Sequence, residues 1–492
     1  MSIKRFSSLR CAWLIHCSNG QIIPRNVAIS ISFILSCLLV SPQHAFSQES
    51  FDPVKAWAQL PALLKRISPP VFPDRKFLIT DFGAVGDGTT DCTEAFKKAI
   101  EACAASGGGR VVVPEGAFLT GAIHLKSNVN LHVSKGATVK FSTDPKKYLP
   151  LVFTRWEGVE CMNYSPLIYA YEQENIAVTG EGTLDGQGAN DNWWSWKGNA
   201  QDGWKEGMPN QSAARKKMFA MAEKGVPVNE RLFGEGHYLR PNFFQPYKCK
   251  NVLVEGVTFK DSPMWFLHPV LCQNVSVLNV TVQGLGPNND GCNPESSKDV
   301  LIKNCSFDTG DDCIAIKSGR NADGRRVAVP SENIIVQQCS MKDGHGGVVV
   351  GSEISGGVRN VFVEDCVMDS PNLDRALRFK TNSVRGGVLE NFLARRIQVG
   401  QVAEAVVKVD FYYEEGDAGP FTPVLRNIAV RDITCKKAQF AFWIKGYERS
   451  PVTNLSVEDC DLNGIQKQDV LEHVQNFTRT NVKVNGKLVN TQ

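Results

Sequence analysis

A phrase of alternating apolar and polar positions recurs along the second half of the chain. Each copy opens with Asn or Asp and continues as a half-buried strand would, with successive side chains on opposite faces. The copies are separated by about 23 to 36 residues, and no long helical pattern intervenes. They begin at Asn251, Asn274, Asp299, Asn333, Asn360, Asn391, Asn427 and Asn454. Regular strands at this period predict an all-β fold, a parallel β-helix in which each coil stacks on the one before it.

The sixth residue after each leading Asn or Asp forms a uniformly small to medium apolar column. Its members are Val257, Val280, Cys305, Cys339, Cys366, Ile397, Ile433 and Cys460. We interpret its four cysteines as buried core thiols, which behave as small hydrophobes, although an exported chain can also form disulfides. Whether Cys92 and Cys103 pair is left open.

The first 47 residues have the pattern of a secretory signal peptide. A long basic region without acidic residues precedes the apolar run 27–40, and small residues follow it. The run is short for a membrane span, so a retained anchor is the weaker interpretation. Removal of the signal leaves a near-neutral chain with no membrane span and no feature that favours nucleic acid. We expect an exported protein, periplasmic or extracellular.

The remaining chain divides into a lead-in segment, 48–75, and one β-helix domain, 76–492. Near its start, within 81–118, Asp91 and Glu94 predict a capping box for a helix that would cap the open end of the stack. The apolar face of this helix would be Ala95, Phe96, Ala99, Ile100 and Cys103. Residues 186–240 interrupt the repeat with a predicted helix at 212–225, an insertion placed to shape a groove. Its tryptophans, Trp193, Trp194 and Trp196, would either wall that groove or pack in the core.

Four successive loops between the predicted strands carry an unusual set of polar residues. The set comprises Asp290, the neighbouring pair Asp311 and Asp312, His345, and the alternating cations Arg378 and Lys380. Asp311 and His345 each lie twelve residues after the start of their copy, so they occupy equivalent places on adjacent coils. Asp-Gly pairs, loop histidines and exposed cations are individually ordinary, but their coincidence at one register indicates a site.

Crowded carboxyl groups with nearby cations suit hydrolysis of an acidic sugar. Glycosidic hydrolysis needs one protonated carboxylic acid and one carboxylate that activates water. Crowding raises the pKa of one carboxyl group, and Arg378 with Lys380 would bind a sugar carboxylate.

At these loops the sequence resembles the polygalacturonase family, family 28 of the glycoside hydrolases. The motifs are "NND" (288–290), "GDD" (310–312), "GHG" (344–346) and "RFK" (378–380), and the resemblance runs from about Phe77 to the C-terminus. It implies a right-handed parallel β-helix, a single-stranded solenoid, and hydrolysis of α-1,4-galacturonosyl links with inversion. No metal and no cofactor are implied, and the expected partner is pectic polysaccharide or galacturonate oligosaccharides.

The resemblance also implies a role for each residue of the set. Asp311 matches the general acid, Asp290 and Asp312 the pair that activates water, and His345 the group that supports the acid's protonation. Arg378 and Lys380 match the clamp on the substrate carboxylate, and Asn288 belongs to the substrate-binding set. We expect Gly310 to let the chain bend so that both neighbouring aspartates reach the groove. Asn289 and Asn293 depart from common family residues, which bears on subsite preference.

Several alternatives remain at this point. The insertion favours exo action by a monomer, but endo action, a rhamnogalacturonan or other substituted galacturonan as substrate, and methyl-ester tolerance stay open. A β-helix pectate lyase would share the architecture and would need calcium, for which the three aspartates offer oxygen ligands. A non-catalytic carbohydrate-binding β-helix is the other rival.

Overall fold

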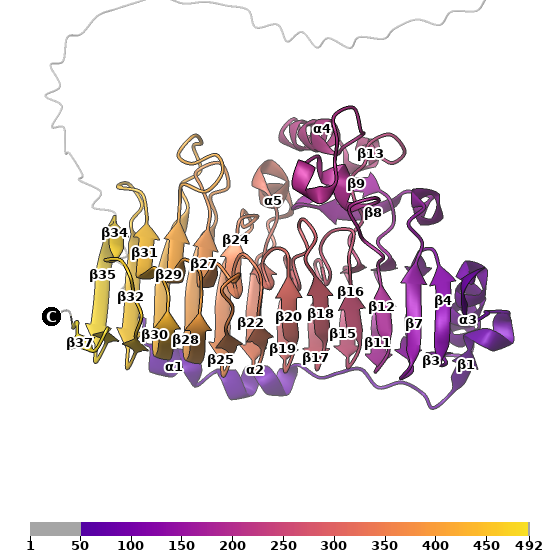
Figure 1. The fold of residues 1–492 in the computed structure, drawn as a ribbon, viewed down its shortest axis with the longest axis horizontal. Coiled ribbons are helices and arrows are strands. Elements are labelled where there is room, and N and C mark those ends of the chain that lie inside the picture. The colour runs from indigo at the N-terminus through magenta and orange to yellow at the C-terminus, as the bar shows by residue number, and fades with distance from the viewer. Residues whose placement is uncertain (1–50, 491–492) are drawn as a thin grey trace, which may run out of the picture. The chain divides into compact units, whose positions relative to one another are not determined.

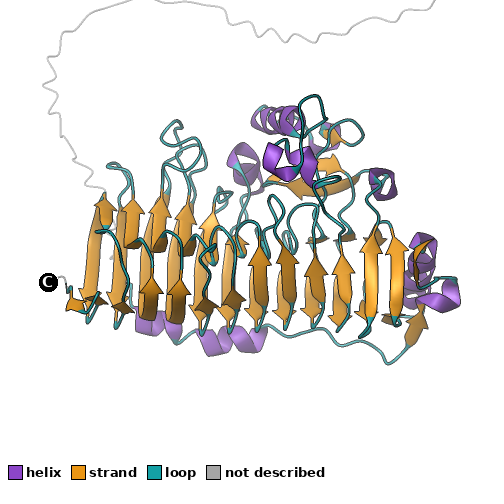
Figure 2. Ribbon diagram, viewed as in Figure 1, coloured by secondary structure: helices purple, strands orange, loops and turns teal. Residues whose placement is uncertain are grey.

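The computed structural model describes residues 51–490, so the predicted signal peptide, 1–47, lies outside the described residues. The described chain is a right-handed parallel β-helix, as the repeat predicts (Figures 1 and 2). Each full coil contributes strands to three parallel runs, and strands in one run pair with the coils before and after.

The first run holds the recurring phrase: β1 (Lys76–Leu78), β3 (Gly109–Val113), β6 (Val129–Val133), β11 (Glu174–Gly180), β15 (Lys250–Glu255), β17 (Gln273–Leu278), β19 (Lys298–Lys303), β22 (Ser331–Gln337), β25 (Val358–Glu364), β28 (Val388–Gln401), β30 (Val424–Lys437), β32 (Val452–Glu458) and β35 (Val474–Thr480). The second run, which β28 and β30 also enter, holds β2 (Asp87–Asp91), β4 (Gly116–Thr120), β7 (Ala137–Phe141), β12 (Thr183–Asp185), β16 (Thr258–Lys260), β18 (Thr281–Gly284), β20 (Ser306–Thr309), β23 (Ser340–Met341), β26 (Val367–Met368), β33 (Asp461–Leu462), β36 (Lys483–Val484) and the antiparallel β37 (Lys487–Leu488). The third run holds β5 (Ile123–His124), β10 (Ile168–Tyr171), β14 (Phe244–Tyr247), β21 (Ile314–Ile316), β24 (Val348–Gly351), β27 (Arg375–Lys380), β29 (Ala405–Asp410), β31 (Phe440–Lys445) and β34 (Val470–Glu472).

The leading Asn or Asp of each copy has a structural reason to recur. All eight adopt a left-handed backbone conformation, which Asn and Asp tolerate better than other side chains. Along most of the stack each asparagine side chain donates to the one on the coil before it, as Asn360 does to Asn333 at 3.2 Å and Asn391 to Asn360 at 3.0 Å. This ladder satisfies amide groups where the chain turns into the next strand.

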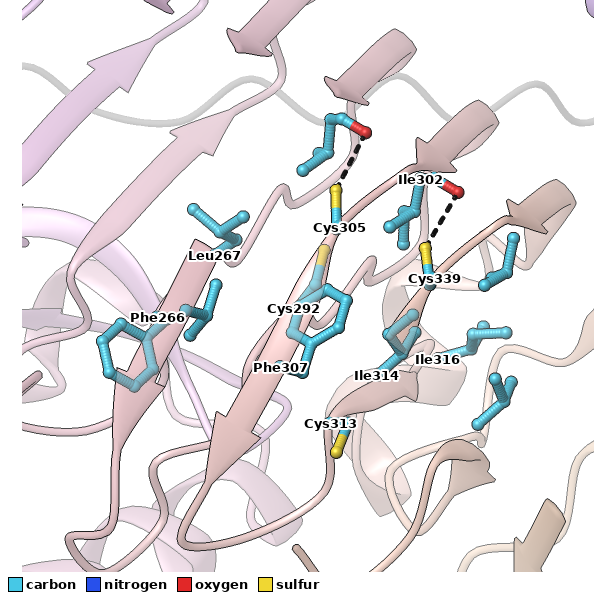
Figure 3. Packing of buried hydrophobic residues seen from close by; sticks show 14 of the residues in the cluster. Phe266, Leu267, Cys292, Ile302, Cys305, Phe307, Cys313, Ile314, Ile316 and Cys339 are labelled. Carbon is cyan, nitrogen blue, oxygen red and sulfur yellow. Dashed lines mark hydrogen bonds between the residues drawn. The ribbon is translucent and has the colours of Figure 1, made fainter. Parts of the chain in front are cut away.

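The predicted interior column is confirmed, and its cysteines are core thiols. Every member of the column is buried. All twelve cysteines among residues 51–490 are free and buried, including Cys92 and Cys103, which therefore do not pair. The Cys305 thiol donates to a backbone carbonyl at 3.4 Å and the Cys339 thiol to the Ile302 carbonyl at 3.6 Å (Figure 3). Small thiols thus fill the interior without leaving an unsatisfied donor.

Helix α3 (Thr93–Ala105) closes the N-terminal end of the stack. The predicted apolar face, Ala95, Phe96, Ala99, Ile100 and Cys103, is buried. The predicted capping box is wrong. Cys92 occupies the N-cap position, and Asp91 instead accepts hydrogen bonds from the backbone and hydroxyl of Thr93, which is already inside the helix.

The lead-in segment packs on the outside of the first run. Helices α1 (Pro53–Trp57) and α2 (Leu60–Arg66) lie across several coils (Figure 1), where Leu63 and its neighbours bury the outward-facing Ile335, Phe362 and Leu393. The Trp57 ring contacts the Phe362 ring edge-on, with 5.5 Å between the ring centroids. Apolar residues on the outer face of a solenoid are therefore covered by the chain's own N-terminal segment.

Leu63→Ala tests whether this segment stabilises the stack. Leu63 is 8% exposed, and truncating a buried leucine costs about 2–5 kcal/mol. We expect the free energy of unfolding, measured by urea denaturation, to fall by about 2 kcal/mol. Lys65→Ala, at an exposed position of the same helix, is the control and is expected to change little. Equal stability of both variants would contradict a stabilising role.

A polar and aromatic protrusion rises over the middle of the stack. It contains the predicted helix as α4 (Ser212–Glu223), together with β13 (Leu232–Phe233) and the hairpin β8 (Val152–Trp156) to β9 (Val159–Asn163) (Figure 1). The hairpin precedes residues 186–240, so the protrusion includes more of the chain than the predicted insertion. The short helix α5 (Asn321–Val327) contacts α4 and β9. Within residues 51–490 no helix combines the length and apolarity that crossing a membrane requires.

Candidate active site

The polar loops that carry Asp290, the Asp311–Asp312 pair and His345 lie side by side where the chain passes from the second run of strands to the third. The fourth predicted loop is wrong, because Arg378 and Lys380 lie within strand β27 of the third run. Ile314 pairs with Val348 on the next coil. Asp311 and His345 precede these two paired residues by the same number of positions in the sequence, so they lie at equivalent places. The backbone N–H of His345 donates to the Asp311 carbonyl at 3.1 Å, and that of Gly291 donates to the Asp312 carbonyl at 3.0 Å. The structure therefore brings together the residues that the register predicts to be neighbours.

Asp311 and Asp312 point to different surroundings. Asp311 lines a cavity, with its side chain 17% exposed, whereas Asp312 is fully buried. The expectation that both aspartates reach the groove is thus wrong for Asp312. Gly310 serves another purpose, because a Cβ there would approach the Gly286 carbonyl oxygen to 2.3 Å. It lets two coils approach closely just before the aspartate pair.

Arg378 and Lys380 extend from the same face of β27, as their spacing predicts. Lys380 Nζ lies 2.6 Å from one carboxylate oxygen of Asp312, and Arg378 Nη1 lies 3.3 Å from the other. Both cations are more than nine-tenths buried. In this structure they neutralise Asp312, the aspartate that burial would otherwise make unfavourable to ionise.

The remaining two carboxyl groups have opposite tendencies to ionise. Burial and the charge of Asp311 raise the pKa of Asp290 well above its ordinary value, although Lys317, 3.6 Å away, opposes this rise. Burial also raises the pKa of Asp311, but the hydrogen bond and charge of His345 outweigh it and hold this pKa well below the ordinary range. Without a ligand, the surroundings therefore favour protonation of Asp290 over protonation of Asp311.

His345 forms the outer partner of Asp311. Its Nδ1 lies 3.0 Å from Asp311 Oδ1, and half of the imidazole is exposed. The hydrogen bond to Asp311 and the charge of that carboxylate raise the pKa of His345 to about 9. The charged imidazolium form of His345 is therefore favoured at neutral pH.

The three aspartates also resemble a cation site, because one oxygen from each lies within 4.8 Å of the others. Carboxylate oxygens suit hard divalent cations. Here, however, Lys380, Arg378 and Lys317 already approach these carboxylates. Side-chain cations thus neutralise the carboxylate cluster, as a bound metal ion would.

A cavity of about 230 Å³ opens at Asp290 and Asp311. The lining residues of this cavity that the sequence predicts are Asn288, Asp290, Asp311, His345, Arg378 and Lys380. The lining residues that it did not predict are Glu157, Lys197, Arg215, Trp265, Lys317, Ser352, Glu353, Tyr413 and Glu414. The missed residues belong to no repeated motif, and several come from the protrusion. Lys317, three residues after Ile314, was visible as a lysine in an otherwise apolar strand.

The protrusion contributes a closed wall to this cavity. Glu157 lies in the β8–β9 turn and pairs with Arg215 of α4, whose Nη2 is 2.6 Å from its carboxylate. On the opposite side, Lys317 lies 3.0 Å from Glu353 and 4.5 Å from the centroid of the Trp265 ring. Paired charges therefore line the cavity on several sides.

A parallel β-helix with clustered carboxyl groups beside a charged cavity defines an enzyme that acts on acidic carbohydrate. Residues 234–483 match the family described as Glycosyl hydrolases family 28, and residues 77–141 match one described as Rhamnogalacturonase A/epimerase, pectate lyase-like. The chain belongs to glycosyl hydrolases family 28, and it is a glycosidase.

Relatives in bacteria and plants support this assignment. The chain is 49% identical to a hyperthermoactive exopolygalacturonase from Thermotoga maritima, whose solved structure it matches with a TM-score of 0.85 over 88% of this chain and 96% of that one. It is 28% identical to an exo-poly-alpha-D-galacturonosidase of Dickeya chrysanthemi over 72% of this chain and 62% of the relative. A probable polygalacturonase of Vitis vinifera is 26% identical over 78% of this chain and 74% of its own length.

Proposed function

We propose that this protein is an exo-acting polygalacturonase that releases galacturonate from the end of an α-1,4-linked galacturonan chain. The small, charged cavity beside Asp311 carries this proposal. At about 230 Å³ it is smaller than the ~300–1,000 Å³ pockets that hold drug-sized ligands, so it suits a terminal sugar and not a passing chain. The identity to exo-acting relatives points the same way. We expect an exported enzyme that meets pectic substrate outside the cytoplasm.

Asp311 is the proposed general acid, and Asp290 with Asp312 is the proposed pair that activates water. One proton is shared by Asp290 and Asp311, and such a proton belongs to the pair and not to either group. When it lies on Asp311 it can pass to the departing glycosidic oxygen, and Asp290 is then the carboxylate that accepts a proton from water. The resemblance implies that His345 supports this acid. Its hydrogen bond and charge oppose the effect of burial and lower the pKa of Asp311 in the unliganded site, so we propose that His345 acts by positioning Asp311 through the 3.0 Å hydrogen bond.

Asp312 is proposed to influence this pair from its buried position outside the cavity. Its carboxylate pairs with Lys380 and Arg378, and after burial and the charge of Asp311 its negative charge also contributes to the raised pKa of Asp290. Arg378 and Lys380 both line the cavity as well. They remain proposed contacts of the substrate carboxylate, reached from the side that faces away from Asp312.

Product stereochemistry and release pattern test this proposal. Inverting enzymes usually hold their carboxyl groups ~6.5–9.5 Å apart, and the oxygens here approach within 4.8 Å, so inversion requires a direct measurement. We expect proton NMR during digestion of trigalacturonate to show β-galacturonate first, with single sugars released from the earliest time point. Its equilibration to the α anomer would follow. Initial α product would contradict inversion, and early internal cleavage of polymer would contradict exo action.

The proton on His345 predicts an alkaline limit to activity. Because its pKa of about 9 lies above the ordinary value of 6.5, His345 stays charged at neutral pH and loses its proton as pH rises through about 9. We therefore expect kcat/KM on trigalacturonate to fall on the alkaline side near pH 9, since this profile reports the free enzyme. In His345→Gln this limit should disappear, because glutamine has no proton to lose in this range. An unchanged profile in the variant would assign the limit to another group.

A further inference from the structure

Lys197 differs from every other cation that lines the cavity. Within residues 51–490 the others each have a carboxylate partner: Arg215 with Glu157, Lys317 with Glu353, Arg378 and Lys380 with Asp312, and His345 with Asp311. The described chain places no carboxylate within 4.0 Å of Lys197 Nζ. Its polar contact is the side-chain oxygen of Asn288, at 2.8 Å. A lysine has three N–H donors, so two remain for a ligand.

The protrusion holds Lys197 in a fixed position. The lysine ends the short 3₁₀ helix η3 (Trp194–Lys197), and Gly198 then turns the chain in a left-handed conformation. Trp194 donates its indole N–H to the Ser262 carbonyl at 2.9 Å, and Trp193 is buried in the main core. The tryptophans of the insertion thus pack in the core and anchor the residue that reaches the cavity.

The charge of Lys197 is poorly compensated where it stands. Asn288 Oδ1 also accepts from Arg240 Nη2 at 2.7 Å, so two cations share one neutral oxygen. Burial lowers the pKa of Lys197, although the charges of Glu157 and Asp311 oppose this effect. An anion entering the cavity would relieve the excess positive charge. A partly buried cation with free donors in a ligand cavity is suited to a carboxylate.

We propose that Lys197 binds the carboxylate of the galacturonate unit in the cavity and selects the ionised sugar over its methyl ester at the chain end. This inference rests on the proposed function. It assigns the main recognition of the terminal carboxylate to the protrusion, because Arg378 and Lys380 are already paired with Asp312. Lys197 is also linked to Asp311 through the side chain of Asn288. Asn288 accepts a hydrogen bond from Lys197, and its Nδ2 is 3.5 Å from Asp311 Oδ2. The test must therefore separate binding from an effect on the acid.

The experiment compares wild type, Lys197→Met and Lys197→Gln on digalacturonate and on its methyl ester. A charge-assisted hydrogen bond lost from binding corresponds to a KM increase of roughly 10- to 100-fold on digalacturonate, with kcat nearly unchanged. Gln keeps an N–H donor for Asn288 without the charge, so it should show the same KM increase. Lys205→Met, at an exposed position of the same insertion, should match wild type.

Preference for the ionised sugar gives a second measurement. Wild type should favour digalacturonate over its methyl ester, and both Lys197 variants should lose most of this preference. An unchanged KM and preference in an active variant would overturn the inference, as would a loss confined to kcat, which would make Lys197 a positioning residue for Asp311. Failure of wild type to cleave digalacturonate would instead overturn the proposed function. Thermal unfolding shows whether each Lys197 variant is folded. If one of the two misfolds, the KM and the substrate preference of the other decide the test.

Discussion

Asp311→Asn is expected to lower kcat on polygalacturonate by about 10²- to 10⁴-fold, the contribution of a positioned general acid. The amide keeps the size of the side chain and can still contact His345, but it cannot donate a proton to the glycosidic oxygen. KM should change little, because Asp311 lines the cavity as one of many polar groups.

Initial rates of galacturonate release with purified variants measure this effect. Asp308→Asn is the matched control, since Asp308 lies in the preceding strand β20 and does not line the cavity. We expect the control to retain wild-type kcat. Full activity of Asp311→Asn would remove Asp311 from the role of acid and would turn attention to Asp290, whose pKa is raised by burial and by the charge of Asp311.

Lys380→Met is expected to damage both stability and activity. It removes the cation 2.6 Å from a fully buried carboxylate and leaves Arg378 at 3.3 Å as the remaining partner. Breaking a buried pair costs about 3–5 kcal/mol, so the free energy of unfolding should fall by about 3 kcal/mol. The buried carboxylate of Asp312 would lose its nearer cation, and kcat should fall by at least about tenfold, because Asp312 belongs to the proposed pair that activates water.

A double variant separates the two effects. If Lys380 and Asp312 are coupled, Lys380→Met with Asp312→Asn should lose less stability than the sum of the losses in the two single variants, while activity stays low. Lys342→Met, at an exposed position, controls for loss of a lysine in general. Urea denaturation and initial rates give the two readouts. Additive losses of stability in the double variant would show that Asp312 is not the main partner of Lys380.

The fold was predictable because each coil repeats the same physical requirements. A left-handed turn residue, an alternating strand and a small interior side chain recur, so the periodicity reports the architecture directly. The outer face of β22, β25 and β28 was not predictable in the same way. Ile335, Phe362 and Leu393 break the expected polar exterior, and their cover comes from α2, far away in sequence.

The site was predictable only as far as it lies on the repeat. Register brings Asp290, Asp311 and His345 together, since equivalent places on adjacent coils are neighbours in space. Register does not tell which aspartate faces the cavity, and Asp312 proved to be buried against Lys380. The wall of the cavity comes from irregular chain, where Glu157 and Lys197 carry no periodic signal. Their places depend on tertiary packing around the tryptophans.

The most direct test of the central claim is mass analysis of the products that wild type forms from polygalacturonic acid over time. The account predicts saturated monogalacturonate from the first sample onward, with the polymer shortening slowly. Unsaturated products would identify a lyase, and an early ladder of oligomers would identify an endo-acting enzyme. The absence of any product from galacturonan would contradict the account altogether.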